Sequence, residues 1–312
     1  MAAYVMCCFF KHQRSTSPSN FNSDIVKIRV ISSDVENGAI PLDDGVLLFE
    51  KAKDLLVSTT LSTFAKKRFF SGSWPVVVTD FMRSLKFGQT ERGSYIVSVL
   101  APITPFSDNS LPDTESSLTR AVSTNLARCL AATKQAIESY EKNNNLLSFD
   151  NAVTQGVSAN LCDAIIGMSG SSRLRDIEIS IELALVEQDT QQLPRVHTFS
   201  CNQIPFLKTA SEYFKGNFVI KNFEVSGLVV RMDHEASDDF GIIRVAANVH
   251  SVERNIAIQL TLSDYWMAFD AHKAKNQVTC CGDLHVTPRS ASLLNPRDFR
   301  VIDNLDLFEE LS

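Results

Sequence analysis

The last third of the chain alternates between apolar and polar residues, which is the pattern of half-buried β-strands. From Asn255 to Leu262, every second residue is a branched apolar one, so these side chains share one face of a strand. Gln277 to Val286 alternates in the same way and contains Gly282, where a barrel strand could bend sharply. Phe223 to Met232 and Gly241 to His250 are also rich in β-forming residues. These four runs predict four strands that are close together in sequence.

A helix is expected between the third and fourth strands of this region. Ser263 can cap its start. Tyr265, Phe269 and His272 then recur at helical spacing and predict a buried face that closes one end of a barrel. The final run, Ser290 to Asp303, is interrupted by a proline and predicts an edge strand or a strand with a bulge. Three strands, one helix and two strands are the element order of an OB-fold barrel.

Upstream of the barrel, helical and strand patterns interleave without an internal repeat. Such interleaving predicts an α+β or α/β arrangement. Strands are expected at Ile25 to Ile31, Ser94 to Leu100, Asp176 to Val186 and Val196 to Phe199. Helices are expected within Asp43 to Phe70, after Pro75, and at Ser116 to Lys142, Ser148 to Met168 and Ile204 to Phe214.

The predicted fold class is therefore α+β, a mixed α/β N-terminal domain followed by a small OB-like β-barrel. With 312 residues, 44% of them hydrophobic, the chain can bury enough apolar surface for two domains. Residues 11–24 are rich in Ser, Asn and Pro, and residues 1–24 are expected to form a poorly ordered N-terminal segment. The expected boundaries are 25–215 for the mixed domain and 216–312 for the barrel with a C-terminal tail.

Charge and hydropathy argue against several classes of protein. The formal net charge is −6 at pH 7, so tight binding driven by phosphate neutralisation is not the default expectation. The chain has no run of 18 apolar residues, which predicts no membrane span and no membrane partner. Met1 to Phe10 is apolar, but the basic residues follow this run, which is the wrong order for a secretory signal. These features predict a cytoplasmic protein.

Cysteine and histidine residues give no recognisable metal or cofactor site. The seven cysteines are odd in number and predict reduced thiols, and the adjacent Cys280 and Cys281 should point to opposite faces of a strand. His234 and His250 lie near strand ends beside several carboxylates, so a divalent ion held between two barrel loops is one hypothesis. Ordinary turn chemistry explains the same acidic residues and is the preferred interpretation. We expect no metal and no cofactor.

The most distinctive local sequence is a polar turn, GQTERGSY, from Gly88 to Tyr95. Glycines bracket the turn, which leads directly into an apolar strand, an arrangement that functional loops often have. In the functional interpretation, Arg92 binds a phosphate or carboxylate, Glu91 orients a ligand or acts as acid or base, and Tyr95 completes the candidate polar site. In the structural interpretation, Glu91 and Arg92 form a surface ion pair. The segment lacks the lysine of a P-loop and the glycine spacing of a dinucleotide site.

A nucleic-acid interface is a further hypothesis, because OB-folds bind single strands with basic grooves and aromatic residues. The segment from Lys221 to Asp303, however, contains nine Lys and Arg residues and eleven Asp and Glu residues, and its predicted strands have few aromatic residues. The same basic residues could instead form solvated surfaces. The candidate binding residues are Lys66, Lys67 and Arg68 in the N-terminal half and Arg244, Arg254 and Arg297 in the barrel.

Three motifs indicate a resemblance to a known group of proteins. GQTERGSY, GVSANLC at Gly156 to Cys162 and LNPRDF at Leu294 to Phe299 occur with the barrel pattern, and together they resemble a widespread group of uncharacterised bacterial proteins. The resemblance spans most of the chain after residue 40 and implies a bacterial cytoplasmic origin. It supplies no activity, and an assignment to phage defence would rest on association alone.

Two functional hypotheses follow from this sequence. In the first, the protein is a non-catalytic binding or assembly component, whose barrel contacts a partner protein or nucleic acid and which can form a homo-oligomer. In the alternative, it is an enzyme or enzyme subunit with a polar site around Glu91 and Arg92, completed by the loop from Gly167 to Ser172.

Overall fold

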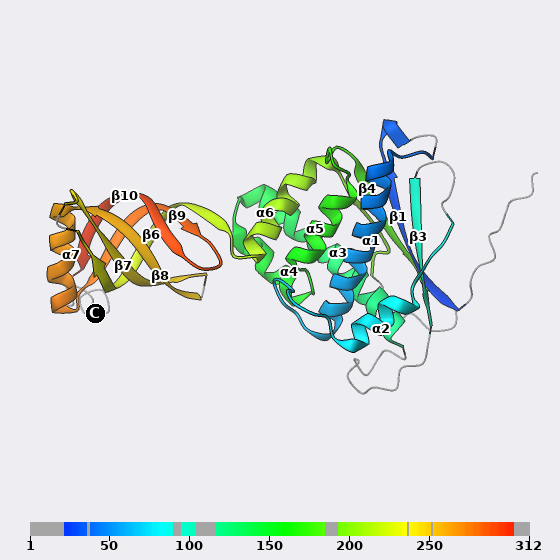
Figure 1. The fold of residues 1–312 in the computed structure, drawn as a ribbon, viewed down its shortest axis with the longest axis horizontal. Helices are drawn as coiled ribbons and strands as arrows, with labels where there is room; N and C mark the ends of the chain where they lie inside the picture. Colours follow the sequence, from blue (N-terminus) through cyan, green and yellow to red (C-terminus); the bar gives the residue numbers. More distant parts are fainter. Residues whose placement is uncertain are drawn as a thin grey trace, which may run out of the picture.

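The computed structural model describes residues 22–35, 38–89, 95–103, 117–184, 193–235, 237–250 and 252–302. In Figure 1 these residues form two lobes, a helical lobe with one sheet and an elongated barrel that projects from it. The fold is α+β, as the sequence predicts. Within the described residues, no helix is both long and apolar enough to cross a bilayer.

The sheet of the larger lobe has five strands in the order β2-β3-β1-β4-β5, all antiparallel. Every second residue of the central strand β1 is buried, because helices cover one face of the sheet. The strands are β1 (Ser23–Ile31), β2 (Lys86–Phe87), β3 (Tyr95–Pro102), β4 (Asp176–Glu182) and β5 (Val196–Phe199).

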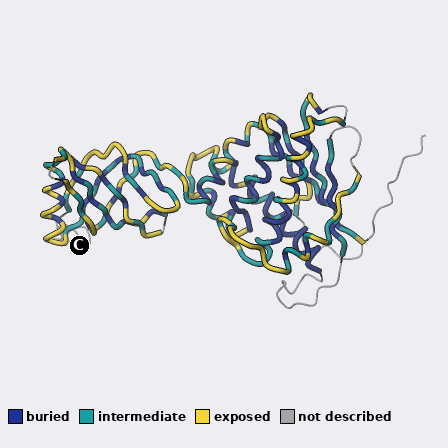
Figure 2. Tube along the Cα trace, in the orientation of Figure 1, coloured by how far each residue is buried: buried dark blue, intermediate teal, exposed yellow. Residues whose placement is uncertain are grey.

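The helices pack in a layer against this sheet, and the dark-blue core of Figure 2 lies between and within these layers. Local sequence sets several helix ends. The Ser117 side chain accepts a hydrogen bond from the Arg120 amide to start α3, and Asn144 ends α3 in the left-handed conformation. The helices are α1 (Leu42–Phe64), α2 (Val76–Ser84), α3 (Leu118–Asn143), α4 (Asp150–Thr154), α5 (Ala159–Met168) and α6 (Ile204–Phe214), with 3-10 turns η1 (Ser33–Val35), η2 (Leu146–Phe149) and η3 (Cys201–Gln203).

The prediction of a single helix from Ser148 to Met168 is wrong. The chain instead forms η2, α4 and α5, with a break at residues 155–158. Gly156 has a φ of +102°, which a helix cannot contain, and Ser158 caps α5 by accepting a hydrogen bond from the Leu161 amide. The GVSANLC motif is therefore a turn followed by a helix start.

The barrel closes in the order β10-β8-β7-β6-β9. β8 and β10 pair in parallel, and the other neighbours are antiparallel, which with α7 between the third and fourth strands is the OB-fold connectivity. Gly282 of β9 allows β10 to lie close to it, since a Cβ there would lie 2.6 Å from the Leu294 carbonyl oxygen. The elements are β6 (Phe218–Asp233), β7 (Phe240–Val249), β8 (Val252–Thr261), α7 (Leu262–Ala274), β9 (Gln277–Val286) and β10 (Ala291–Ile302).

Helix α7 differs from its prediction in two ways. Thr261, not Ser263, caps it by accepting a hydrogen bond from the Asp264 amide. Its buried residues are Tyr265, Ala268 and Ala271, whereas Phe269 and His272 are exposed. Small alanines let the helix lie close on the barrel end, which rotates the large aromatic Phe269 outward.

Strand β10 carries the bulges expected around its proline. Its register with β9 shifts twice between Leu294 and Arg300, and Asn295 and Asp298 have positive φ. It is no free edge, because its first residues pair with both β8 and β9.

The two lobes have separate hydrophobic cores, one formed by the helices and the large sheet and one inside the barrel. Phe218, at the start of β6, packs against both cores. The junction between the lobes is therefore a packed contact as well as a chain connection.

Candidate functional site

Two of the three residues of the predicted polar site, Glu91 and Arg92, lie outside the described residues. Tyr95 is half-buried at the first position of β3, opposite Val30, and packs on the core of the larger lobe. A Cβ on Gly45 would lie 3.9 Å from the Tyr95 hydroxyl. This hydroxyl is therefore beside the first turn of α1.

The loop from Gly167 to Ser172, assigned to the same site, is also tied to the start of α1. Both the amide and the hydroxyl of Ser171 donate to Asp44 at 2.9 Å. The Arg175 guanidinium joins the same carboxylate at 2.6 Å and also contacts Asp34. Tyr95 and this loop therefore converge on one end of the sheet.

The carboxylates of this network stay charged at neutral pH. The Arg175 hydrogen bond lowers the pKa of Asp34 to about 2. The Ser171 amide, followed by Arg175, holds the pKa of Asp44 below its usual value despite burial. A proton donor or acceptor at pH 7 needs a pKa nearer to 7. The Asp34, Asp44 and Arg175 network therefore has the properties of a structural clamp.

The three basic residues that follow α1 differ in their contacts. Lys66 donates from Nζ to Asn125 at 2.7 Å, and Arg68 donates to Asp150 at 2.8 Å. Lys67 is exposed and lines a cavity of about 420 Å³ beside Trp74. The structure thus ties Lys66 and Arg68 into the helical lobe and leaves Lys67 at the surface.

Arg68 belongs to a chain of polar contacts that crosses the junction between the lobes. Asp150 accepts from Arg68 and from the Tyr213 hydroxyl at 3.0 Å, and the Tyr213 oxygen lies 3.1 Å from Nδ1 of His250. The Arg68 guanidinium also lies over the Tyr213 ring, 5.2 Å from its centre. We call Arg68, Asp150, Tyr213 and His250 the junction cluster.

Hydrogen-bond roles in the junction cluster follow from counting protons. Asp150 is an acceptor, so the single hydroxyl proton of Tyr213 is donated to it. The Tyr213 oxygen must then accept from His250, which places the imidazole proton on Nδ1 and leaves Nε2 as an acceptor. Burial lowers the pKa of His250 and, together with Asp150, raises the pKa of Tyr213 to about 12. Both side chains are therefore neutral at pH 7.

A cleft of about 580 Å³ opens beside the junction cluster and has His250 in its wall. Its walls come from both lobes, namely the end of α3 with η2, the helix α6 and the start of β6. Clefts of this volume between domains are common positions for small-molecule sites. Among its lining residues are Tyr140, Asn144, Thr209, Asn217, Phe218 and His250.

The barrel arginines do not gather into one patch. Arg244 pairs with Arg231 of β6. Arg297 pairs with Cys281 of β9, which in turn pairs with Glu224 of β6. Glu224 and Arg231 are seven residues apart along β6, which is about 23 Å of extended chain. Arg254 pairs with Ala247 of β7, which faces the barrel interior. Ala247 is three positions from Arg244 along β7, so the two residues are on opposite faces of the strand, and Arg254 is on the face opposite to that of Arg244. A continuous basic groove is therefore not formed by these three residues.

The hypothesis of an ion held by His234 and His250 is wrong. The two histidines lie at opposite ends of the ten-residue strand β7, about 30 Å apart. His234 packs near Tyr265, and the described residues contain no group of three metal-ligating side chains.

Helix α7 lies at the end of the barrel farthest from the larger lobe (Figure 1). It exposes several large apolar side chains. Trp266, Met267 and Phe269 are 54%, 46% and 45% exposed, and Phe240 of β7 is also exposed. The rings of Trp266 and Phe269 meet edge to face at 5.9 Å. We call these four residues the barrel-end patch.

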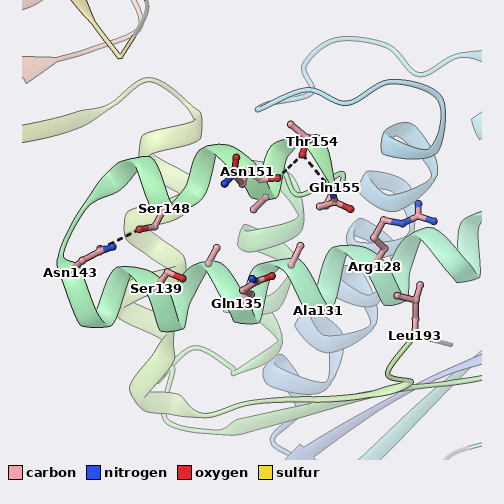
Figure 3. Close-up of a pocket in the computed structure, with 13 residues that line it drawn as sticks. Arg128, Ala131, Gln135, Ser139, Asn143, Ser148, Asn151, Thr154, Gln155 and Leu193 are labelled. Carbon is pink, nitrogen blue, oxygen red and sulfur yellow. Dashed lines mark hydrogen bonds between the residues drawn. The ribbon is translucent and has the colours of Figure 1, made fainter. Parts of the chain in front are cut away.

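Another cavity, of about 700 Å³, is a polar groove between α3 and the η2–α4 segment. Figure 3 shows Gln135 on one wall and Asn151 on the other. Alanines of α3 form the floor, and most other lining side chains are neutral amides and hydroxyls. Neither a charge cluster nor an aromatic ring in this groove specifies a ligand.

Comparison with protein-family models, with curated proteins and with solved structures gave no match. The assignment of a site therefore depends on geometry. Sequence reasoning selected Arg68 and noted His250, but it missed Asp150 and Tyr213. Arg68 and Asp150 are 82 residues apart, and Tyr213 and His250 are 37 apart, so local spacing gave no signal for either contact.

Proposed function

We propose that the protein is a non-catalytic binding component whose barrel docks a partner protein through the barrel-end patch. The observation that carries this proposal is the exposure of Trp266, Met267 and Phe269 on α7, a helix that already buries its opposite face. On a surface helix the side away from the core normally carries polar and charged residues, so large apolar side chains there favour a covering partner. Clustered exposed aromatic residues are typical of protein interfaces.

Charge around the patch specifies the chemistry of the partner. The β6–β7 connection and α7 with its C-cap carry five carboxylates, against two lysines. His234, within this acidic connection, lies 6.4 Å from Trp266 between ring centres, so the acidic segment borders the patch. A partner with an apolar centre and a rim of Lys and Arg would complement this surface.

The same charge distribution disfavours other occupants. A second copy that packed α7 against α7 would oppose acidic rim to acidic rim, and nucleic acid would bring phosphates to carboxylates. The five carboxylates of the rim are Glu235, Asp238, Asp239, Asp264 and Asp270.

The test compares the wild-type protein with a Trp266→Glu, Phe269→Glu variant in affinity purification from native cells. We expect one stoichiometric partner with the wild type and a loss of at least 30-fold with the variant, because central aromatic residues dominate interface energies. Retention should fall as salt rises, since rim charges contribute to the association. A photo-crosslinker at position 267 should label a basic-rimmed apolar surface of that partner.

The matched control is Trp74→Glu, which changes an exposed tryptophan of the larger lobe. It should retain the partner. Equal retention by both variants, or no stoichiometric partner with the wild type, would contradict the proposal. Light scattering tests for a second copy, and anisotropy with labelled single-stranded and duplex nucleic acids tests for a nucleic-acid partner.

A further inference from the structure

The cleft beside the junction cluster presents aromatic rings together with neutral hydrogen-bonding groups. Tyr140, Phe218 and His250 contribute rings, and Asn144 and Asn217 contribute exposed amides. No hydrogen bond within the described part of the chain uses the side-chain amide of either asparagine. Both amides are therefore able to bind a ligand through a donor and an acceptor.

The charges at the cleft already have partners at its rim. Lys221 pairs with Asp283 at 2.9 Å, and Glu212 lies 3.9 Å from Lys208. With these charges paired, the inner part of the cleft is neutral. Such a wall favours a ligand whose recognised part is uncharged.

His250 adds a directional requirement. Its Nδ1 faces Tyr213, so Nε2 is the ring atom left to accept a hydrogen bond. A ligand in contact with this nitrogen must present an N–H or O–H group. Rings at the wall accommodate a flat ligand, and amides pair with donor and acceptor groups along its edge.

We propose that this cleft binds a nucleobase, either of a free nucleoside or of an unstacked single strand, with a base N–H directed to Nε2 of His250. A nucleobase is flat, uncharged, and carries donors and acceptors in one plane. The volume of about 580 Å³ is in the range of small-ligand sites. The start of β6, which lines the cleft, lies at the opposite end of the barrel from α7 (Figure 1). This site therefore goes beyond the proposed partner interface.

The probes are uridine, cytidine, adenosine and guanosine, measured by saturation-transfer NMR and calorimetry with the full chain. We expect at least one nucleoside to bind. If uridine binds, 3-methyluridine should bind at least 10-fold more weakly, because its ring N–H is replaced by a methyl group. A single-stranded octamer of the same base separates the two sources, since tighter binding of the octamer indicates a strand and equal binding indicates the free nucleoside.

Three variants locate the site. His250→Phe keeps a ring against Phe218 but removes the acceptor, and Asn217→Ala removes an amide; each should weaken binding at least 10-fold. Asn151→Ala, in the groove of Figure 3, should leave binding unchanged and is the control. Thermal unfolding and a wild-type-like amide spectrum of the helical lobe verify folding of each variant.

If none of the four nucleosides binds with a Kd of about 1 mM or tighter, the proposal is overturned. Binding that survives both His250→Phe and Asn217→Ala would overturn it as well. Neither result bears on the barrel-end patch, whose test uses different residues.

Discussion

The phenolic oxygen of Tyr213, near the end of α6, lies 3.1 Å from Nδ1 of His250, just beyond the end of β7, and this contact joins the helical lobe to the barrel. The same oxygen is 3.0 Å from Asp150. Tyr213 is fully buried, and its ring packs with those of Phe218 and His250, of which the Phe218 and His250 rings are stacked. The orientation of the barrel therefore depends on a small polar and aromatic contact.

Tyr213→Phe should loosen this junction while leaving both cores packed. The change removes one hydroxyl and leaves the His250 Nδ1–H and one Asp150 oxygen without that partner, at a cost of about 1–3 kcal/mol. Faster amide hydrogen exchange in residues 215–220, with little change in the barrel strands, is the expected result. Tyr140→Phe is the control, because the Tyr140 hydroxyl makes no hydrogen bond among the described residues. Equal exchange in the two variants would contradict this role of Tyr213.

Stability should fall as the pH is lowered through the histidine range. Burial lowers the pKa of both His250 and His197, so the folded state binds fewer protons than the unfolded chain. This contribution is complete above the unfolded value of about 6.5, declines below it and levels off below the folded pKa. Denaturant unfolding between pH 8 and 5 measures the slope. His250→Gln should reduce the slope, and an unchanged slope in that variant would exclude His250 as a contributor.

The ion pair of Arg120 with Asp24 should be costly to break. The Arg120 and Asp24 side chains are 3% and 0% exposed, and the Ala184 backbone also bonds to both side chains. Arg120→Met leaves the carboxylate buried without its counter-charge, so we expect a loss of about 3–5 kcal/mol in the free energy of unfolding.

Two further variants distinguish a buried pair from a surface pair. Arg120→Met combined with Asp24→Leu should recover much of the stability, since it leaves no isolated charge. Arg83→Met removes a pair with Asp80 that is mostly exposed and should cost less than about 1 kcal/mol. Equal losses in the free energy of unfolding for Arg120→Met and Arg83→Met would contradict a larger contribution from the buried pair.

Gly156→Ala should destabilise the larger lobe. The φ of +102° at this position disfavours any residue with a Cβ, and an added Cβ would lie 2.9 Å from the Cys129 Sγ and 3.0 Å from the Lys66 Nζ. We expect a loss of about 2 kcal/mol or more from strain and crowding together. Gly72→Ala, where φ is +88° but the surroundings are open, isolates the conformational part. Thermal unfolding that ranks Gly72→Ala as the more damaging change would contradict the crowding at Gly156.

Much of the barrel could be predicted from sequence because its signals are local. Strand β9 matches its predicted bounds, and β7 differs by one residue at each end, since alternation with period two depends only on neighbouring residues. The bulges of β10 follow from a proline that cannot donate to a sheet. The face of α7 could not be predicted in this way. Which residues turn inward depends on how closely the helix approaches the barrel, and Ala268 and Ala271 allow the closest approach.

The functional geometry required tertiary structure for a related reason. Sequence alone determined the fold class, the positions of most helices and strands and the acidic balance that disfavours a phosphate-binding groove, because each depends on composition or short-range periodicity. Only the folded chain brings Arg68, Asp150, Tyr213 and His250 together, separates Arg244 from Arg297 and turns Trp266 and Phe269 outward. Those relationships arise from contacts between elements that are distant in sequence, where packing and burial decide which side chains meet.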